Sequence, residues 1–188
     1  LLLPSRAAVI FQSDFESDPR AAGWCSWVPD EKSATPAWAE GGAKSGTRCL
    51  AVTRGRWRSP MIPVTPGAYY LAETFIRGEG PGLWHALYFD GNSVKLESSI
   101  DLANAKTGIC TGTDQSKDWQ RQVMCFKAAL GVTHAQLIFE PRADKALMID
   151  DVTVREAGWQ DAAQWAKEIY GTVPPVKYAP PDDRWRNL

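Results

Sequence analysis

The side chains best suited to chemistry in this chain are aromatic rings set among carboxylates, amides and guanidinium groups. The sequence contains nine Trp in 188 residues. Indole and phenol rings offer flat apolar surfaces that can stack against the C–H faces of sugars, and neighbouring polar groups can hydrogen-bond the sugar hydroxyls. This combination of residue types is typical of carbohydrate recognition.

Strand alternation predicts which of these side chains face outward. Successive residues of a strand point to opposite faces of a sheet, and we apply this rule to residues 68–77, 83–90 and 135–140. The outward set should line an oligosaccharide groove on a concave sheet: Trp84, Tyr88, Glu73, Arg77, Gln136 and Glu140. The inward set is mostly apolar: Tyr70, Ala72, Thr74, Ile76, Leu83, His85, Leu87, Phe89, Ala135, Leu137 and Phe139. Trp24 and Trp27, near the first loop, are further candidates for ligand binding, and the alternative for each ring is packing in the core.

Catalytic motifs are missing from the sequence. The chain has two His, His85 and His134, and neither belongs to a recognisable motif. There is no G-x-S-x-G elbow, no H-E-x-x-H and no phosphate-cradling glycine loop. We therefore expect a non-catalytic chain. Glu73 with Glu140 as an acid–base pair of a small lyase or glycosidase is the alternative.

The elements that would position these residues are short strands separated by Gly and Pro turns. We expect strands over residues 9–11, 22–28, 48–53, 59–64, 68–77, 83–90, 94–100, 119–128, 134–140 and 146–155. Many short strands with no helical period between them favour an all-β fold, a two-sheet antiparallel β-sandwich of the jelly-roll type. Residues 161–170 should form one helix, which Gly171 ends. We expect a sandwich domain over 1–157 and a helix with a Pro-rich tail over 158–188.

Charge and hydropathy exclude several classes of partner. The formal net charge is −1 and the pI is about 6.2, so nothing in the composition recruits nucleic acid or an anionic membrane. No run of about 18 apolar residues is present, so we expect no membrane-spanning helix. Residues 1–8 are either a remnant of an export signal or a frayed chain end.

The four cysteines allow three pairings. No pair has the CxxC spacing of a zinc site, and no His completes one. Disulfides Cys25–Cys49 and Cys110–Cys125 would join neighbouring strands in an oxidising compartment, and this is the pairing that we predict. Four buried free thiols are the alternative.

Four segments resemble carbohydrate-binding modules of the family 4, 9 and 22 type, which have a galactose-binding-like β-jelly roll. Gln12–Glu16, followed by Gly23-Trp24, resembles the opening "N-G-x-F-E … G-W" pattern of these modules. Ala43–Val52 is similar to their "S-G-x-x-S-L-x-V" segment, and Pro66–Tyr70 to their "P-G-x-x-Y" strand entry. Met148–Val154 resembles their closing "I-D-D-V-x-L" strand. The resemblance covers residues 8–155.

The resemblance also implies a structural calcium ion that ties the first strand to the last. Calcium takes six to eight oxygen ligands from carboxylates and backbone carbonyls. The implied ligands are the carboxylates of Glu16 and Asp150 with the carbonyls of Asp14 and Lys44. The alternative is that both carboxylates are solvated turn residues.

Together these features predict a secreted, periplasmic or cell-surface carbohydrate-binding module. Its partners should be an oligo- or polysaccharide and a neighbouring catalytic domain, which the module would target to its substrate; we expect no nucleic acid or membrane partner and a monomeric chain. The alternatives are a structural sandwich that binds no glycan and the small lyase or glycosidase already named.

Overall fold

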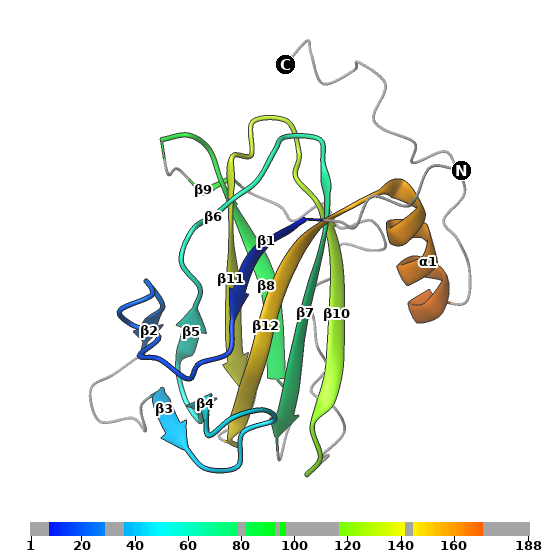
Figure 1. The fold of residues 1–188 in the computed structure, drawn as a ribbon. Helices are drawn as coiled ribbons and strands as arrows, with labels where there is room; N and C mark the ends of the chain where they lie inside the picture. Colours follow the sequence, from blue (N-terminus) through cyan, green and yellow to red (C-terminus); the bar gives the residue numbers. More distant parts are fainter. Residues whose placement is uncertain are drawn as a thin grey trace.

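The computed structural model describes residues 8–28, 36–78, 82–92, 95–96, 117–141 and 145–170. They form two antiparallel sheets that face each other, with one helix on the outside (Figure 1). This confirms the predicted β-sandwich. Within these residues, no helix has the length and apolar character that a membrane span requires.

Sheet A brings the two ends of the sandwich together. Its strands run in the order β10 (Gln120–Lys127), β7 (Tyr69–Gly78), β12 (Leu147–Ala157), β4 (Arg48–Val52) and β3 (Ala37–Glu40), and β1 (Val9–Ser13) also pairs with β12. In the β1–β12 pair, Phe11 lies opposite Val154 and Ser13 lies opposite Val152. The first and last strands are therefore neighbours, as predicted.

Sheet B forms the other layer. Its strands run in the order β2 (Cys25–Trp27), β5 (Arg56–Arg58), β11 (His134–Pro141), β8 (Gly82–Phe89) and β9 (Lys95–Leu96), and β6 (Ile62–Pro63) also pairs with β11. Central strand β11 has alternate residues Ala135, Leu137 and Phe139 fully buried. Alternation assigned β7 correctly, because the charged Glu73 and Arg77 mark its outer face. In β11 it assigned the inward set correctly, but Gln136 and Ile138 of the other face are buried as well, at 9% and 0% exposed.

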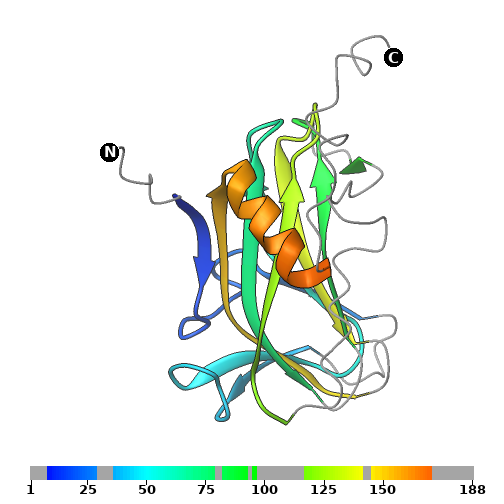
Figure 2. The same cartoon turned by 90° about the vertical axis from the view of Figure 1, so that its right-hand side faces the viewer.

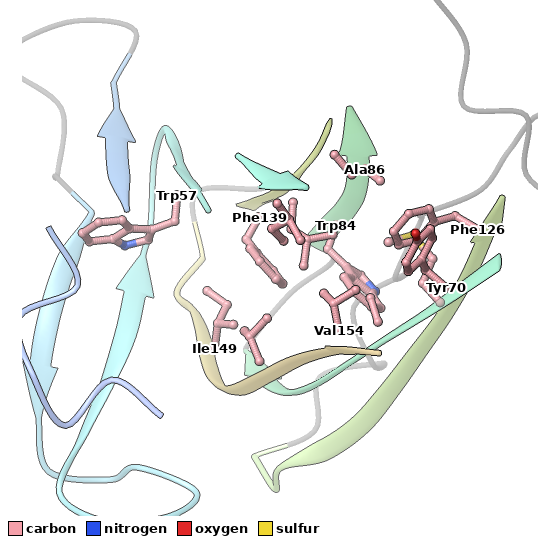
Figure 3. Close-up of a cluster of buried hydrophobic side chains, with 14 of the residues drawn as sticks. Trp57, Tyr70, Trp84, Ala86, Phe126, Phe139, Ile149 and Val154 are labelled. Carbon is pink, nitrogen blue, oxygen red and sulfur yellow. The ribbon is translucent and has the colours of Figure 1, made fainter. Parts of the chain in front are cut away.

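The core between the sheets is rich in aromatic rings (Figure 3). Tyr70 stacks on Phe126 with ring centroids 5.3 Å apart, and Trp84 lies nearly parallel to Phe139 at 5.8 Å. These rings come from both sheets, so burial of their apolar area holds the layers together.

Helix α1 (Trp159–Tyr170) covers part of the outer face of sheet A (Figure 2). Its Ala162 and Trp165 are buried against Leu71, Cys125 and Ala157 of the strands. The indole Nε1–H of Trp165 also donates to the carbonyl of Val123 at 3.0 Å. The helix therefore packs on the sandwich, and it begins two residues earlier than predicted.

Two strands were not predicted from the sequence. Strands β3 and β5 have four and three residues, too few for alternation to stand out. Residues 59–64 form only the two-residue strand β6 beside the prolines. Of the predicted strand over 94–100, Lys95 and Leu96 form β9, and the other residues lie outside those described.

Candidate functional site

Strand β8 faces the opposite way to the prediction. Trp84, Ala86 and Tyr88 are 2%, 4% and 2% exposed and belong to the core, where Figure 3 shows Trp84 and Ala86. Tyr88 packs against Phe126. His85, which was assigned to the interior, lies on the outer face and is partly exposed. The assignment of Trp84 and Tyr88 as outward sugar platforms is therefore wrong, because their large rings fill the space between the sheets.

Trp24 is also an interior residue. It is 2% exposed and packs among three rings: Phe11, Phe15 and Phe139. A sugar cannot stack on it without opening the core, so its assignment as a ligand residue is wrong.

Glu73 and Arg77 lie on the outer face of sheet A, away from Gln136 and Glu140 of sheet B. The Glu73 carboxylate pairs with Arg121 at 2.6 Å, and no contact joins it to Arg77. The predicted six-residue patch is therefore divided between the sheets. Glu73 and Glu140 belong to different sheets, so they form no acid–base pair for a lyase or glycosidase.

Arg77 has apolar partners. Its guanidinium lies 5.1 Å from the ring centre of Trp119, and its Nε and Nη2 lie 3.2 and 3.1 Å from the sulfur of Met148. Gly42 makes room for this packing, because a side chain there would meet Nη2 closely. We therefore regard Arg77 as a packing residue of this face.

The outer face of sheet B gathers the polar and aromatic residues that remain. Directly opposite residues of antiparallel strands share a face. Trp27 lies opposite Arg56 in the β2–β5 pair, and Arg58 lies opposite Ile138 in the β5–β11 pair. Alternation along β11 then adds Gln136 and Glu140. We call this set the sheet B face: Trp27, Arg56, Arg58, Gln136 and Glu140.

The geometry of the sheet B face leaves one aromatic ring open beside charged groups. Trp27 is 43% exposed, and the guanidinium of Arg56 lies 4.3 Å from the centre of its ring. Nη1 of Arg56 is 3.8 Å from Oε2 of Glu140. Gln136 is held in place because its Nε2 donates to the carbonyl of Ser59 at 2.8 Å. Gln136 itself is buried, at 9% exposed, and lies four residues along β11 from Glu140. An exposed ring flanked by both charge signs can contact a sugar's C–H face and its hydroxyls together.

Sequence reasoning found three of the five residues of this face. Trp27, Gln136 and Glu140 were candidates, whereas Arg56 and Arg58 were missed because strand β5 was not predicted. The available signal was the polar–apolar–polar order Arg56-Trp57-Arg58, in which the fully buried Trp57 forces both arginines outward.

Two carboxylates hold the loop of residues 44–48 against the first and last strands. Oδ2 of Asp150 accepts the backbone N–H groups of Lys44 and Ser45 at 2.8 and 3.2 Å. Oε1 of Glu16 accepts the N–H groups of Thr47 and Arg48, both at 2.9 Å. The two carboxylates therefore clamp successive residues of one loop.

Local backbone geometry makes the clamp possible. A β-bulge interrupts the β12–β7 register between Asp150 and Thr153, and Asp151 has a φ of 50°. Bulges redirect side chains, and here Oδ1 of Asp150 accepts the N–H of Asp151 at 2.8 Å. Gly46 has a φ of 59°, and any side chain there would overlap the Glu16 carboxylate.

The pKa values of the two clamp carboxyls move in opposite directions. Hydrogen bonds from the backbone N–H groups of Arg48 and Thr47 lower the pKa of Glu16, because they favour its charged form. Burial raises the pKa of Asp150, and the N–H donors of Ser45, Lys44 and Asp151 offset only part of this. Asp150 is therefore an enclosed carboxylate whose desolvation is only partly offset by its N–H donors.

The clamp residues fit calcium in charge and in donor type. Glu16 and Asp150 supply the hard oxygen donors that calcium prefers, and a cation would offset the desolvation of Asp150. No three acidic, His or Cys side chains of the described part of the chain converge on one point, so backbone carbonyls would have to complete the shell. The side chain of Asp14 accepts the backbone N–H of Glu16. The backbone N–H of Lys44 donates to the carboxylate of Asp150. Their carbonyls as calcium ligands stay a prediction.

The predicted disulfide Cys25–Cys49 does not form. Both are free thiols: Cys25 is exposed on β2 of sheet B, and Cys49 is buried in β4 of sheet A. Burial raises the pKa of the Cys49 thiol to about 11. Cys125 is fully buried beneath helix α1. Cys110 lies outside the described residues, so its pairing with Cys125 stays a prediction.

The chain matches no family model and no curated protein sequence. Its fold, however, is similar to solved structures. The first is the endo-1,4-β-D-xylanase 10B of Clostridium thermocellum, as CBM22-1–GH10 modules complexed with xylohexaose; the TM-score is 0.59 and the identity 17%, over 80% of this chain and 29% of that chain. The chain thus spans less than a third of that protein's length.

Two further structures are matched over almost their whole length. The CBM22-1 xylan-binding domain of Paenibacillus barcinonensis Xyn10C has a TM-score of 0.57 and 13% identity, over 80% of this chain and 95% of that one. The K3 cleaved adhesin domain of Lys-gingipain from Porphyromonas gingivalis has a TM-score of 0.51 and 13% identity, over 79% and 98%. The chain therefore has a β-sandwich fold similar to that of these solved structures, which include CBM22 modules.

Proposed function

We propose that this chain is a non-catalytic carbohydrate-binding module and that it binds glycan on the sheet B face. The observation that carries the proposal is the exposed ring of Trp27 beside Arg56 and Glu140. The fold supports it, because the solved structures with this architecture include a xylan-binding domain and modules complexed with xylohexaose.

In this role Trp27 provides the stacking surface and its neighbours provide hydrogen bonds. A sugar ring placed on the indole leaves its hydroxyls within reach of the guanidinium of Arg56 and the carboxylate of Glu140. Hydrogen bonds to charged groups contribute about 1.5–3 kcal/mol each. Both side chains are partly shielded, at 28% and 22% exposed, so these bonds are less weakened by water than fully exposed ones.

The proposal extends to the role of the module within a larger protein. Such a module would hold an attached catalytic domain against a polysaccharide outside the cell. The competing function is a structural sandwich that binds no glycan, and a glycan array separates the two because only the module retains any sugar.

The direct test replaces Trp27 and compares it with a tryptophan on the opposite side of the molecule. Trp27→Ala should lower retention in affinity electrophoresis by tenfold or more, about 1.4 kcal/mol of binding free energy, with little change in melting temperature. Trp159→Ala is the matched control, since Trp159 is 38% exposed on helix α1 and its loss should leave retention unchanged. Equal retention by Trp27→Ala and the unmodified protein would contradict the proposal.

A further inference from the structure

We propose that the ligand of the sheet B face is an acidic glycan, whose uronate carboxylates are bound by Arg56 and Arg58. This inference rests on the proposed function and names the chemical class of its ligand. The observation behind it is a pair of guanidinium groups on neighbouring positions of one face with too few acceptors around them.

The charges of the face do not balance. Arg56 faces Glu140 at 3.8 Å, which is too long for a hydrogen bond. Arg58, two residues along the same strand, has no carboxylate partner among the residues that the structure describes. Two positive groups therefore share one carboxylate, in a protein whose overall net charge is −1.

The Nε–H donors of both arginines are also without a partner. Among the described residues, three buried side-chain nitrogen or oxygen atoms lack a partner: Trp24 Nε1, Arg56 Nε and Arg58 Nε. Two of the three therefore lie on strand β5, on the same face. Buried donors are normally paired, because an unpaired one forfeits its bonds to water. The missing partner here is a hydrogen-bond acceptor.

Two arginines on the other surfaces of the sandwich have close carboxylate partners. Arg121 pairs with Glu73 at 2.6 Å and Arg48 with Glu40 at 2.8 Å. Arg77 packs between Trp119 and Met148. The two described arginines with a buried, unpartnered Nε both lie on β5, the strand that pairs with the strand of Trp27.

A carboxylate matches what the two guanidinium groups lack. The guanidinium fork binds a carboxylate through two parallel N–H bonds, one of which can come from Nε. The Nε atoms are covered in the free protein, so the carboxylate would first meet the more accessible Nη atoms. A side-chain rotation of the kind common at interfaces would then bring Nε to it. A uronic acid combines this carboxylate with a sugar ring for Trp27.

The test uses polysaccharides whose charge can be removed without changing the backbone linkage. Glucuronoxylan, polygalacturonate and alginate are each compared with their carboxyl-reduced forms by affinity electrophoresis and titration calorimetry. At least one acidic form should bind about tenfold or more tightly than its reduced form. This difference is the affinity expected from one pair of charge-assisted hydrogen bonds, which carboxyl reduction removes. The difference should shrink as salt is raised, because exposed charges are screened.

Arg58→Gln should bring the acidic-to-reduced affinity ratio close to one while binding of the reduced form persists. Arg77→Gln, on the other sheet, is the matched control and should keep the ratio. Dextran sulfate against dextran tests for sulfate instead, and selective binding of the sulfated form alone would overturn the uronate assignment. If the acidic and reduced forms bind equally well and Trp27→Ala loses binding of both, this inference is overturned and the proposed function stands. Binding of no glycan at all would overturn both.

Discussion

Trp84 and Trp27 show how differently one residue type is used in this molecule. Trp84 is 2% exposed and stacks on Phe139, whereas Trp27 is 43% exposed and meets Arg56 across its ring. Burial of an indole contributes stability through apolar area and close packing. An open indole leaves that area available to a ligand.

We therefore expect Trp84→Ala to act on stability. The cavity and the lost apolar burial should lower the free energy of unfolding by about 3–5 kcal/mol, which urea denaturation measures. Trp27→Ala is the control and should cost about 1 kcal/mol or less. A Trp84→Ala protein with unchanged stability and no sugar binding would show that the ring is accessible after all.

The residues of β8 also explain why its orientation could not be predicted. One alternating set contains Leu83, His85, Leu87 and Phe89, and the other contains Trp84, Ala86 and Tyr88, so both are mainly apolar and neither carries a charged residue such as Glu or Arg. In β7 the charged Glu73 and Arg77 mark the outer set, and the prediction there was right. Alternation decides a strand's orientation only where one of its faces is polar.

Helix α1 is the element that distinguishes the two outer surfaces. It covers Leu71 and Cys125 of sheet A with Ala162 and Trp165. Because its apolar side is already used, the helix belongs to the folded sandwich rather than to a flexible connection.

Trp165→Ala should uncover this part of sheet A. Loss of the buried ring and of its hydrogen bond to Val123 should lower the free energy of unfolding by about 3 kcal/mol. Urea denaturation measures this loss. Trp159→Ala is the control, since its ring is already 38% exposed, and a smaller loss is expected. Similar losses for the two variants would mean that the helix contributes little through Trp165.

At the scale of the whole molecule, the clamp on residues 44–48 joins the beginning of the chain to its end. We propose that calcium supports this junction through Glu16 and Asp150. An ion that binds the folded state alone adds about 2.7 kcal/mol at a hundred times its Kd, a rise of about 5 °C or more in melting temperature for a chain of this size.

Chelation with EDTA at pH 7 should reverse that rise, measured by calorimetry. Asp150→Asn should remove the response to calcium, and Glu73→Gln, a carboxyl far from the loop, should keep it. The same junction should respond to acid, because the folded-state pKa of Glu16 is lowered. Its carboxylate therefore stabilises the fold above its ordinary pKa, and this contribution is lost as pH falls through the lowered value. An identical melting temperature with and without calcium would contradict the proposal.

The overall architecture could be predicted because its signals are local. Turn residues such as Pro66-Gly67 separate the strands, and the segments around Glu16 and Asp150 mark the paired first and last strands. The composition of the sheet B face could not, because it depends on which strands become neighbours. Trp27, Arg56 and Glu140 are far apart in the sequence, and they meet only through the β2–β5–β11 order.

The position of helix α1 has a practical consequence. The helix covers part of the outer face of sheet A, whereas the proposed ligand face is the outer face of sheet B, so the two lie on opposite sides of the sandwich. A surface or label coupled through the exposed ring of Trp159 or nearby residues of α1 would leave the sheet B face unobstructed. Oriented immobilisation through the helix should thus preserve full ligand capacity on a sensor chip, whereas coupling through Cys25, which lies beside Arg58 on β2 and β5, should block it.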